Sequence, residues 1–197
     1  LRSIIRQDPD IIMVGEIRDK ETAGIAVNAA MTGHLVLSTM HASDAPTTLT
    51  RLLDMGVEAF LVASTVNIVI AQRLVRRICE KCRASYTLTD EERESFKEMP
   101  ILQKRLLERE KTLNVTRLYK GEGCKACSHT GLSGRIGVFE VLEVNETIKS
   151  LIMKRATSGE IMKAAIGEGM TTMVEDGLQK ALNGITTIAE IIRVTQE

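Results

Sequence analysis

The chain has 197 residues, of which 44% are hydrophobic, 26% are charged and 3% are aromatic, and its formal net charge is zero. This composition is ordinary for a globular protein with a substantial core. The lack of tryptophan and of a basic excess argues against a protein that binds nucleic acid through a charged face or through stacked bases. We therefore expect a folded protein with no nucleic-acid partner.

The most apolar stretch of the sequence runs from Val57 to Ile78. Its uncharged part, Ala59 to Gln72, is shorter than the about 20 residues that a membrane-spanning helix needs, and it contains Ser64 and Asn67. We expect a buried helix of a soluble protein at this place. The opening residues show no signal-peptide pattern, so we also expect a cytoplasmic, reducing setting.

The first part of the chain alternates between strand and helix patterns. Ile11–Val14 is a short apolar run of the kind found in strands buried on both faces. Apolar residues then recur at helical spacing from Ala23 to Met31, a second strand is predicted at Leu35–Leu37, and a second helix ends at Gly56. This order predicts a parallel sheet, in which ligands bind at the carboxyl ends of the strands.

The sequence pattern changes after the first cysteine pair. A charged helix is predicted from Thr89 to Lys111, with Thr89 and Glu92 as a capping box. Good strand formers follow between Gly134 and Val144. The rest, Thr147 to Glu197, has the pattern of short helices separated by glycines, and Thr187 is a suitable cap for the last one.

Polar side chains follow both predicted strands of the first part. Glu16 comes directly after the first strand, where ATPases place a carboxylate beside magnesium and the attacking water. Thr39 and His41 follow the second strand, and their side chains can hydrogen-bond a γ-phosphate. Each group alone is common on a protein surface, and so is His34. Their presence at adjacent strand ends favours a phosphate site.

All four cysteines lie in two CxxC pairs, Cys79 with Cys82 and Cys124 with Cys127. Two such pairs complete a tetrahedron of sulfur ligands, which is typical of structural zinc. Redox-active pairs or iron in the same sulfur cage are the alternatives. His129 lies close enough in sequence to replace one ligand, but four cysteines suffice.

Two segments carry a resemblance to a known family. Leu1-Arg2 together with Gln7–Asp19 resembles the Walker B region of the secretion ATPase superfamily, in the branch of general secretory pathway protein E and the type IV pilus assembly ATPases. Thr32–His41 resembles the His box of that family. The resemblance extends over essentially the whole chain. It implies an α/β fold, namely part of a RecA-like P-loop ATPase core with an inserted tetracysteine zinc subdomain and a helical C-terminal region.

The resemblance also implies roles for single residues. Glu16 matches the Walker B glutamate, and Arg18 falls on the arginine that follows it, in a supporting role. Arg2 and Arg6 are weaker candidates. His41, with His34, matches the His box. The predicted catalytic and nucleotide-binding residues are Glu16, Arg18, His34, Thr39 and His41, and the predicted zinc ligands are Cys79, Cys82, Cys124 and Cys127.

The family divides the chain into residues 1–78 as ATPase core, 79–130 as metal-binding insertion and 131–197 as the segment that completes the ATPase domain. It implies an ATP hydrolase that uses ATP and Mg²⁺ and contains structural Zn²⁺. It further implies a homohexamer that is peripheral to the inner membrane on the cytoplasmic side, where platform proteins of type II secretion or type IV pilus assembly are its partners. The cysteine pairs favour an assembly or secretion motor over a retraction motor.

Two family features are missing from the sequence. The Gly-rich loop that holds the phosphates is absent, as is the acidic box that follows it, so we expect these 197 residues alone not to hydrolyse ATP. Two other functions stay open. The CxxC pairs and the basic cluster Arg73, Arg76 and Arg77 are compatible with a zinc-stapled nucleic-acid-binding module, and the core is compatible with a DNA-translocating ATPase.

Overall fold

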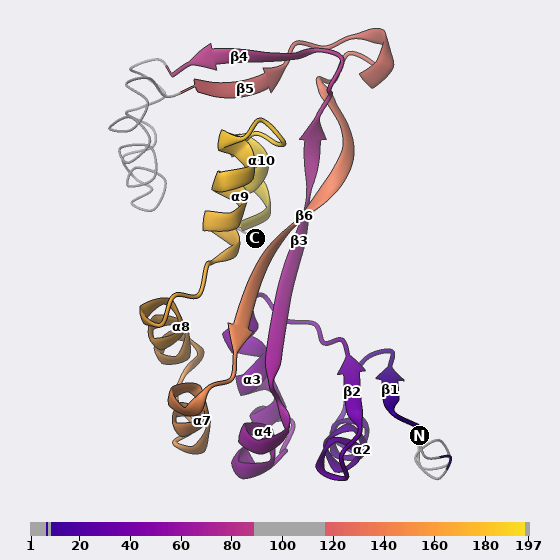
Figure 1. The fold of residues 1–197 in the computed structure, drawn as a ribbon, viewed down its shortest axis with the longest axis vertical. Helices are drawn as coiled ribbons and strands as arrows, with labels where there is room; N and C mark the ends of the chain where they lie inside the picture. Colours follow the sequence, from indigo (N-terminus) through magenta and orange to yellow (C-terminus); the bar gives the residue numbers. More distant parts are fainter. Residues whose placement is uncertain (1–6, 8, 89–116, 196–197) are drawn as a thin grey trace. The chain divides into compact units, whose positions relative to one another are not determined.

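A computed structural model describes residues 7, 9–88 and 117–195 (Figure 1). The predicted helix at Thr89–Lys111 and the candidates Arg2 and Arg6 lie outside these described residues. The chain forms two compact units. Unit 1 comprises Leu1–Ala71 and Glu140–Met170, and unit 2 comprises Gln72–Phe139 and Thr171–Glu197. The division into 1–78, 79–130 and 131–197 stays a prediction about the whole protein.

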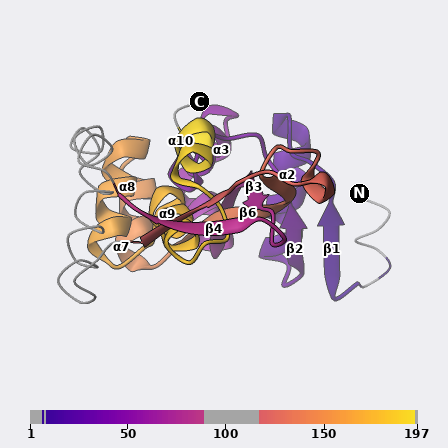
Figure 2. The ribbon, with the colours of Figure 1, turned by 90° about the horizontal axis from the view of Figure 1, so that it is seen from above.

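Unit 1 is built on two parallel strands joined by a helix. β1 (Ile11–Val14) pairs with β2 (Leu35–Ser38), with Ile11 opposite Leu35 and Val14 opposite Ser38. Both strands therefore end at the same edge, and they lie side by side in both views (Figures 1 and 2). The predicted β-α-β start of the chain is confirmed, including the positive φ of Gly33 after the helix.

The helices of unit 1 begin at side chains that satisfy their free N–H groups. In α2 (Lys20–Met31), Oδ1 of Asp19 accepts from the Thr22 amide at 2.8 Å. In α3 (Ala45–Asp54), Asp44 does the same for Thr47 at 2.7 Å. The unit is completed by α4 (Ala59–Thr65), α7 (Glu146–Met153) and α8 (Ser158–Gly167).

The core of unit 1 combines residues from both of its chain segments. α4 packs on α7, and α3 packs on α8. The largest side chains with almost no solvent exposure come from α3, α4, the end of β6, α7 and α8, and they are Leu49, Val62, Leu142, Ile148, Ile152 and Ile161. This burial is the main stabilising term of the unit.

Unit 2 contains a small antiparallel pair and two helices. β4 (Arg83–Thr87) pairs with β5 (Arg117–Gly121), with Arg83 opposite Gly121. α9 (Met173–Leu182) and α10 (Ile188–Thr195) pack on each other, and α9 also packs on β5. Its buried apolar residues come from these elements and from β3 and β6, and include Val75, Leu118, Val138, Leu178, Leu182 and Ile191.

Two long strands have residues in both units. β3 (Ile68–Ile78) pairs with β6 (Leu132–Glu143). The strand predicted between Gly134 and Val144 is confirmed by β6. Near one end of the pair the Val144 amide donates to the Asn67 carbonyl, and near the other end the Cys79 amide donates to the Gly131 carbonyl, both at 2.9 Å.

The expected single buried helix between Ala59 and Gln72 is wrong. The helix α4 ends at Thr65, and β3 begins at Ile68. The physical reason is the run of β-branched residues from Val66 to Ile70, interrupted only by Asn67, which favours a strand over a helix. Among the described residues no helix combines the length and the apolar character needed to cross a bilayer.

Candidate functional site

The segments that follow β1 and β2 are tied together. The Ile17 amide donates to the Thr39 carbonyl at 2.9 Å, and Thr39 Oγ1 donates to the Gly15 carbonyl at 2.7 Å. The predicted site residue Thr39 thus connects the ends of the two strands. Its hydroxyl binds the backbone carbonyl next to Glu16, and so it helps to fix the backbone position of Glu16.

The Glu16 carboxylate is flanked by a guanidinium and an imidazole. Its Oε2 accepts from Nε of Arg18 at 2.6 Å, and its Oε1 lies 2.8 Å from Nε2 of His41. Oε1 is buried, yet it accepts no hydrogen bond of good geometry from the described residues, because the approach of His41 is not aligned with the bond. A buried carboxylate oxygen without a donor is costly, and it marks a place where a further donor is expected.

The loop that carries His41 is held by α3. The Arg51 guanidinium, on the third turn of α3, donates to the His41 carbonyl through Nη1. The imidazole itself is largely exposed, so this backbone contact is what fixes its position beside Glu16. Arg51 could not be predicted from the sequence, because a contact to a backbone carbonyl leaves no motif.

His34 lies elsewhere in unit 1. It directly precedes β2, whereas His41 follows the strand, so the two histidines are at opposite ends of β2. Its Nδ1 is 3.0 Å from the Ala29 carbonyl and 3.0 Å from Oγ1 of Thr32. The structure brings Glu16, Arg18, Thr39 and His41 together and leaves His34 apart from them. A role for His34 in the site stays a prediction.

A second carboxylate close to this region was not predicted. Glu140, on β6, is 3% exposed, and its Oε1 accepts from the Ala45 amide at the start of α3 at 2.9 Å. In the strand pattern, Glu140 alternates in phase with Val138 and Leu142, which places it on the buried face, where a carboxylate is unusual. Only the structure shows that its carboxylate binds the Ala45 amide.

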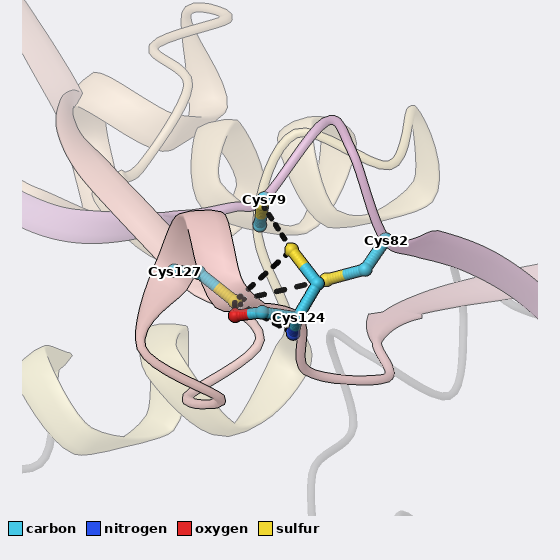
Figure 3. Close-up of side chains that lie close together, drawn as sticks. All are labelled: Cys79, Cys82, Cys124 and Cys127. Carbon is cyan, nitrogen blue, oxygen red and sulfur yellow. Dashed lines mark hydrogen bonds between the residues drawn. The ribbon is translucent and has the colours of Figure 1, made fainter.

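The four cysteines of unit 2 converge, although two turns far apart in the sequence supply them. Cys79 and Cys82 lie in the turn between β3 and β4, whereas Cys124 directly precedes the 3-10 helix η2 (Lys125–Cys127) and Cys127 ends it. Their sulfur atoms all lie within 4.8 Å of one another, and Figure 3 shows the side chains directed toward a common centre. The measured Sγ–Sγ distances are 3.9 Å for Cys79–Cys124, 3.8 Å for Cys82–Cys127 and 3.8 Å for Cys124–Cys127.

These distances match a tetrahedral zinc site. Four sulfurs at the usual Zn–S length of about 2.3 Å are about 3.8 Å apart. Among the described residues, the cysteines are also the only group of three or more potential ligand side chains that converges in this way, and His129 is not part of it. The four sulfurs therefore suffice for a closed, structural site.

Backbone amides around Cys127 stabilise its sulfur as a thiolate, the form that binds a metal. The amide of Cys124 donates to Sγ of Cys127 at 3.2 Å, and the amide of Gly131 donates to it at 3.3 Å. The Cys124 hydrogen bond, with burial acting against it, lowers the pKa of Cys127 to about 6. Burial raises the pKa of Cys82 to about 12 in the absence of a metal. A bound dication removes that penalty, since thiolates are its ligands.

Comparison with known proteins shows the family of the chain. Residues 1–193 match the family described as "Type II/IV secretion system protein". The type IV pilus assembly ATPase PilB of Thermus thermophilus is 47% identical over 197 residues, which are 100% of this chain and 21% of that protein. The type II secretion system protein E of Xanthomonas campestris is 48% identical and matches 100% of this chain and 33% of its own length.

Solved structures show the fold independently. The pilus retraction motor PilT with bound ADP has a TM-score of 0.64 at 22% identity, covering 100% of this chain and 42% of its own. The Legionella pneumophila ATPase DotB has a TM-score of 0.62 at 20% identity, covering 99% and 41%. The chain thus spans well under half of these proteins and has an α/β ATPase-like fold. The resemblance seen in the sequence is confirmed: the chain belongs to the type II/IV secretion system protein family.

Proposed function

We propose that this chain is part of an ATP-driven motor for type II protein secretion or type IV pilus assembly, and that it contributes residues that act in ATP hydrolysis. One observation carries the proposal. The buried Oε1 of Glu16 accepts no well-aligned hydrogen bond from the part of the chain that the structure describes, and it lies at the shared carboxyl edge of β1 and β2 with His41 Nε2 2.8 Å away. The curated relatives named above, PilB and protein E, support the choice of motor.

Glu16 acts in this proposal as the acceptor that holds water. Its free lone pairs take a hydrogen bond from the attacking water or from a water bound to Mg²⁺, as carboxylates do in phosphoryl transfer. Mg²⁺ supplies neutralisation of phosphate charge when it is bound. Arg18 keeps the carboxylate oriented through Oε2, at 2.6 Å.

His41 and Thr39 line the same edge. The imidazole of His41 is exposed enough to turn from Glu16 toward a phosphate oxygen, and so it can report the presence of a γ-phosphate. The Thr39 hydroxyl donates to the Gly15 carbonyl, which keeps the two strand ends in register. His34, at the opposite end of β2, is assigned at most an indirect role.

The remaining elements of the proposal are inferred from the family and not from the geometry of the site. The sequence has no Gly-rich phosphate loop, so the complete site needs further residues, and these 197 residues alone do not hydrolyse ATP in our proposal. The active form is a homohexamer, peripheral to the inner membrane on the cytoplasmic side and docked on platform proteins. Zn²⁺ at the four cysteines is structural and stabilises unit 2.

The test uses the full-length protein that contains this chain. Magnesium-dependent ATP hydrolysis that is unaffected by DNA, with no retention on heparin at moderate salt, is the expected result. Hydrolysis that rises strongly on addition of DNA would favour a DNA-translocating ATPase instead. A protein that binds heparin and does not bind ATP would favour the nucleic-acid-binding module.

A further inference from the structure

Glu140 is a buried carboxylate that the proposed chemistry does not use. It is 3% exposed, and it lies 95 positions along the chain from the amide that its Oε1 accepts, that of Ala45. Ala45 is itself fully buried. Burying a carboxylate costs much free energy, so the contact between Glu140 and the Ala45 amide needs a physical explanation.

The start of α3 explains the contact. The first N–H groups of a helix have no partner inside the helix. At the start of α3, Pro46 has no N–H, and Asp44 accepts from Thr47 at 2.7 Å. Glu140 satisfies the Ala45 amide at 2.9 Å, and its negative charge lies at the positive end of the helix. Glu140 therefore fixes where α3 begins.

The start of α3 is also the end of the His41 loop. Only Ala42, Ser43 and Asp44 separate His41 from Ala45. Two turns further along the same helix, Arg51 reaches back and donates to the His41 carbonyl. The His41 loop is therefore attached to α3 in two places, at Ala45, where the helix begins, and at the contact between Arg51 and the His41 carbonyl. A displacement of α3 moves the loop at both places.

We infer that Glu140 is a positioning residue for His41, acting through α3 and Arg51. The inference rests on the proposed function, because it concerns the placement of His41 beside Glu16. Glu140 touches neither nucleotide nor water in this role. It holds the helix that keeps Nε2 of His41 2.8 Å from Glu16.

The test is a double-mutant cycle on ATP hydrolysis by the full-length protein. Glu140→Leu removes the acceptor and keeps an apolar side chain of similar length, and Glu143→Leu, at an exposed position of the same strand, is the matched control. We expect Glu140→Leu to lower kcat about tenfold with KM for ATP nearly unchanged, since small misplacements of catalytic groups are that costly. The control is expected to change kcat less than twofold, as is usual for an independent surface site.

The decisive arm repeats the substitution in a His41→Ala background. If Glu140 acts through His41, Glu140→Leu lowers kcat little further there. An equal tenfold loss in both backgrounds would show a merely structural role and overturn the inference. Should Glu140→Leu not fold, Glu140→Met replaces it, because methionine fills a similar volume and also lacks the carboxylate acceptor. A kcat loss that vanishes with His41→Ala supports the inference, and no loss overturns it.

Failure of the inference is distinguishable from failure of the proposed function. If Glu16→Gln and His41→Ala lower turnover but Glu140→Leu does not alter it, only the role of Glu140 is refuted. If Glu16→Gln leaves turnover unchanged, the proposed function itself fails. Hydrogen exchange of the Ala45 amide gives an independent readout: we expect it to accelerate in Glu140→Leu and to stay protected in Glu143→Leu.

Discussion

Nε2 of His41 lies 2.8 Å from Oε1 of Glu16, although a helix and a strand separate the two residues along the chain. The parallel register of β1 and β2 produces this proximity, because Val14 lies opposite Ser38 and both strands end together. The loops that leave that edge then bring an acid and an imidazole side by side. The same register makes the site sensitive to small shifts of either loop.

His41→Ala is expected to lower the rate of ATP hydrolysis by the full-length protein about tenfold or more, while ADP binding changes little. The imidazole lies 2.8 Å from Oε1 of Glu16, and its loss removes a group at the proposed phosphate edge. Steady-state kinetics and ADP titration measure the two quantities. His129→Ala, which changes an exposed histidine outside the cysteine cluster, is the control. Unchanged turnover in His41→Ala would contradict the assignment.

The chain is expected to contain one zinc ion. Elemental analysis of purified protein should give about one Zn²⁺ per chain, and Cys127→Ser should lose it, because the four sulfurs are already 3.8–3.9 Å apart across three of their pairs. A strong chelator should lower the melting temperature of the native chain. His129→Ala should keep its zinc. A zinc-free native protein, or zinc that persists in Cys127→Ser, would refute the site.

Glu190 is expected to make stability depend on pH. Burial alone raises its pKa, but hydrogen bonds from Arg193 and Arg76 outweigh burial and lower the pKa from 4.5 to about 2. A carboxylate with a lowered folded-state pKa stabilises the fold above its unfolded-state pKa, and this stabilisation is lost as pH falls from about 5 to about 2. The loss amounts to about 2–3 kcal/mol, because the two arginines are half exposed and partly screened.

Urea unfolding at several pH values tests this expectation. Glu190→Gln should be less stable than the native chain at pH 7 and should lack this acid-dependent loss. Glu80→Gln, which breaks the exposed pair with Arg77, is the comparison and should cost less than about 1 kcal/mol. Parallel pH profiles of the native chain and Glu190→Gln would count against the buried pair.

Two glycines in helices should respond oppositely to alanine. A Cβ at Gly177, in α9, would meet Cδ1 of the buried Ile191 at 2.7 Å, so Gly177→Ala should destabilise the chain by about 1–2 kcal/mol. A Cβ at the exposed Gly159, in α8, would meet no atom within 4 Å. Gly159→Ala should therefore stabilise by about 0.5 kcal/mol, because alanine is the better helix former. Thermal unfolding decides, and equal shifts in both variants would contradict the α9–α10 packing.

The features that depend on local sequence pattern could be predicted from the sequence. The apolar run Ile11–Val14, the acid behind it and the strand at Leu35 predicted the parallel pair and the proximity of Glu16 to His41. The spacing of the cysteines predicted their convergence in the same way, since a CxxC turn forms locally and two such turns complete a ligand set.

Other features depend on contacts between distant segments, which a single sequence does not reveal. The alternation of β6 places Glu140 on its buried face, but neither for Glu140 nor for Glu190 does the sequence show the distant partner that its carboxylate binds. Arg51 binds a backbone carbonyl, which any residue type provides. The stretch from Ala59 was misassigned because apolar periodicity alone does not separate a helix of seven residues from the strand that follows it.

The most direct test of the account is ATP turnover by the full-length protein with Glu16→Gln, beside Glu21→Gln as the control. Glu21 is an exposed glutamate in the first turn of α2, so its change should leave turnover intact. The account predicts that Glu16→Gln still binds ATP and Mg²⁺ but hydrolyses ATP at least about a hundredfold more slowly. Undiminished hydrolysis by Glu16→Gln would contradict the central claim and leave a zinc-stapled binding module as the better description.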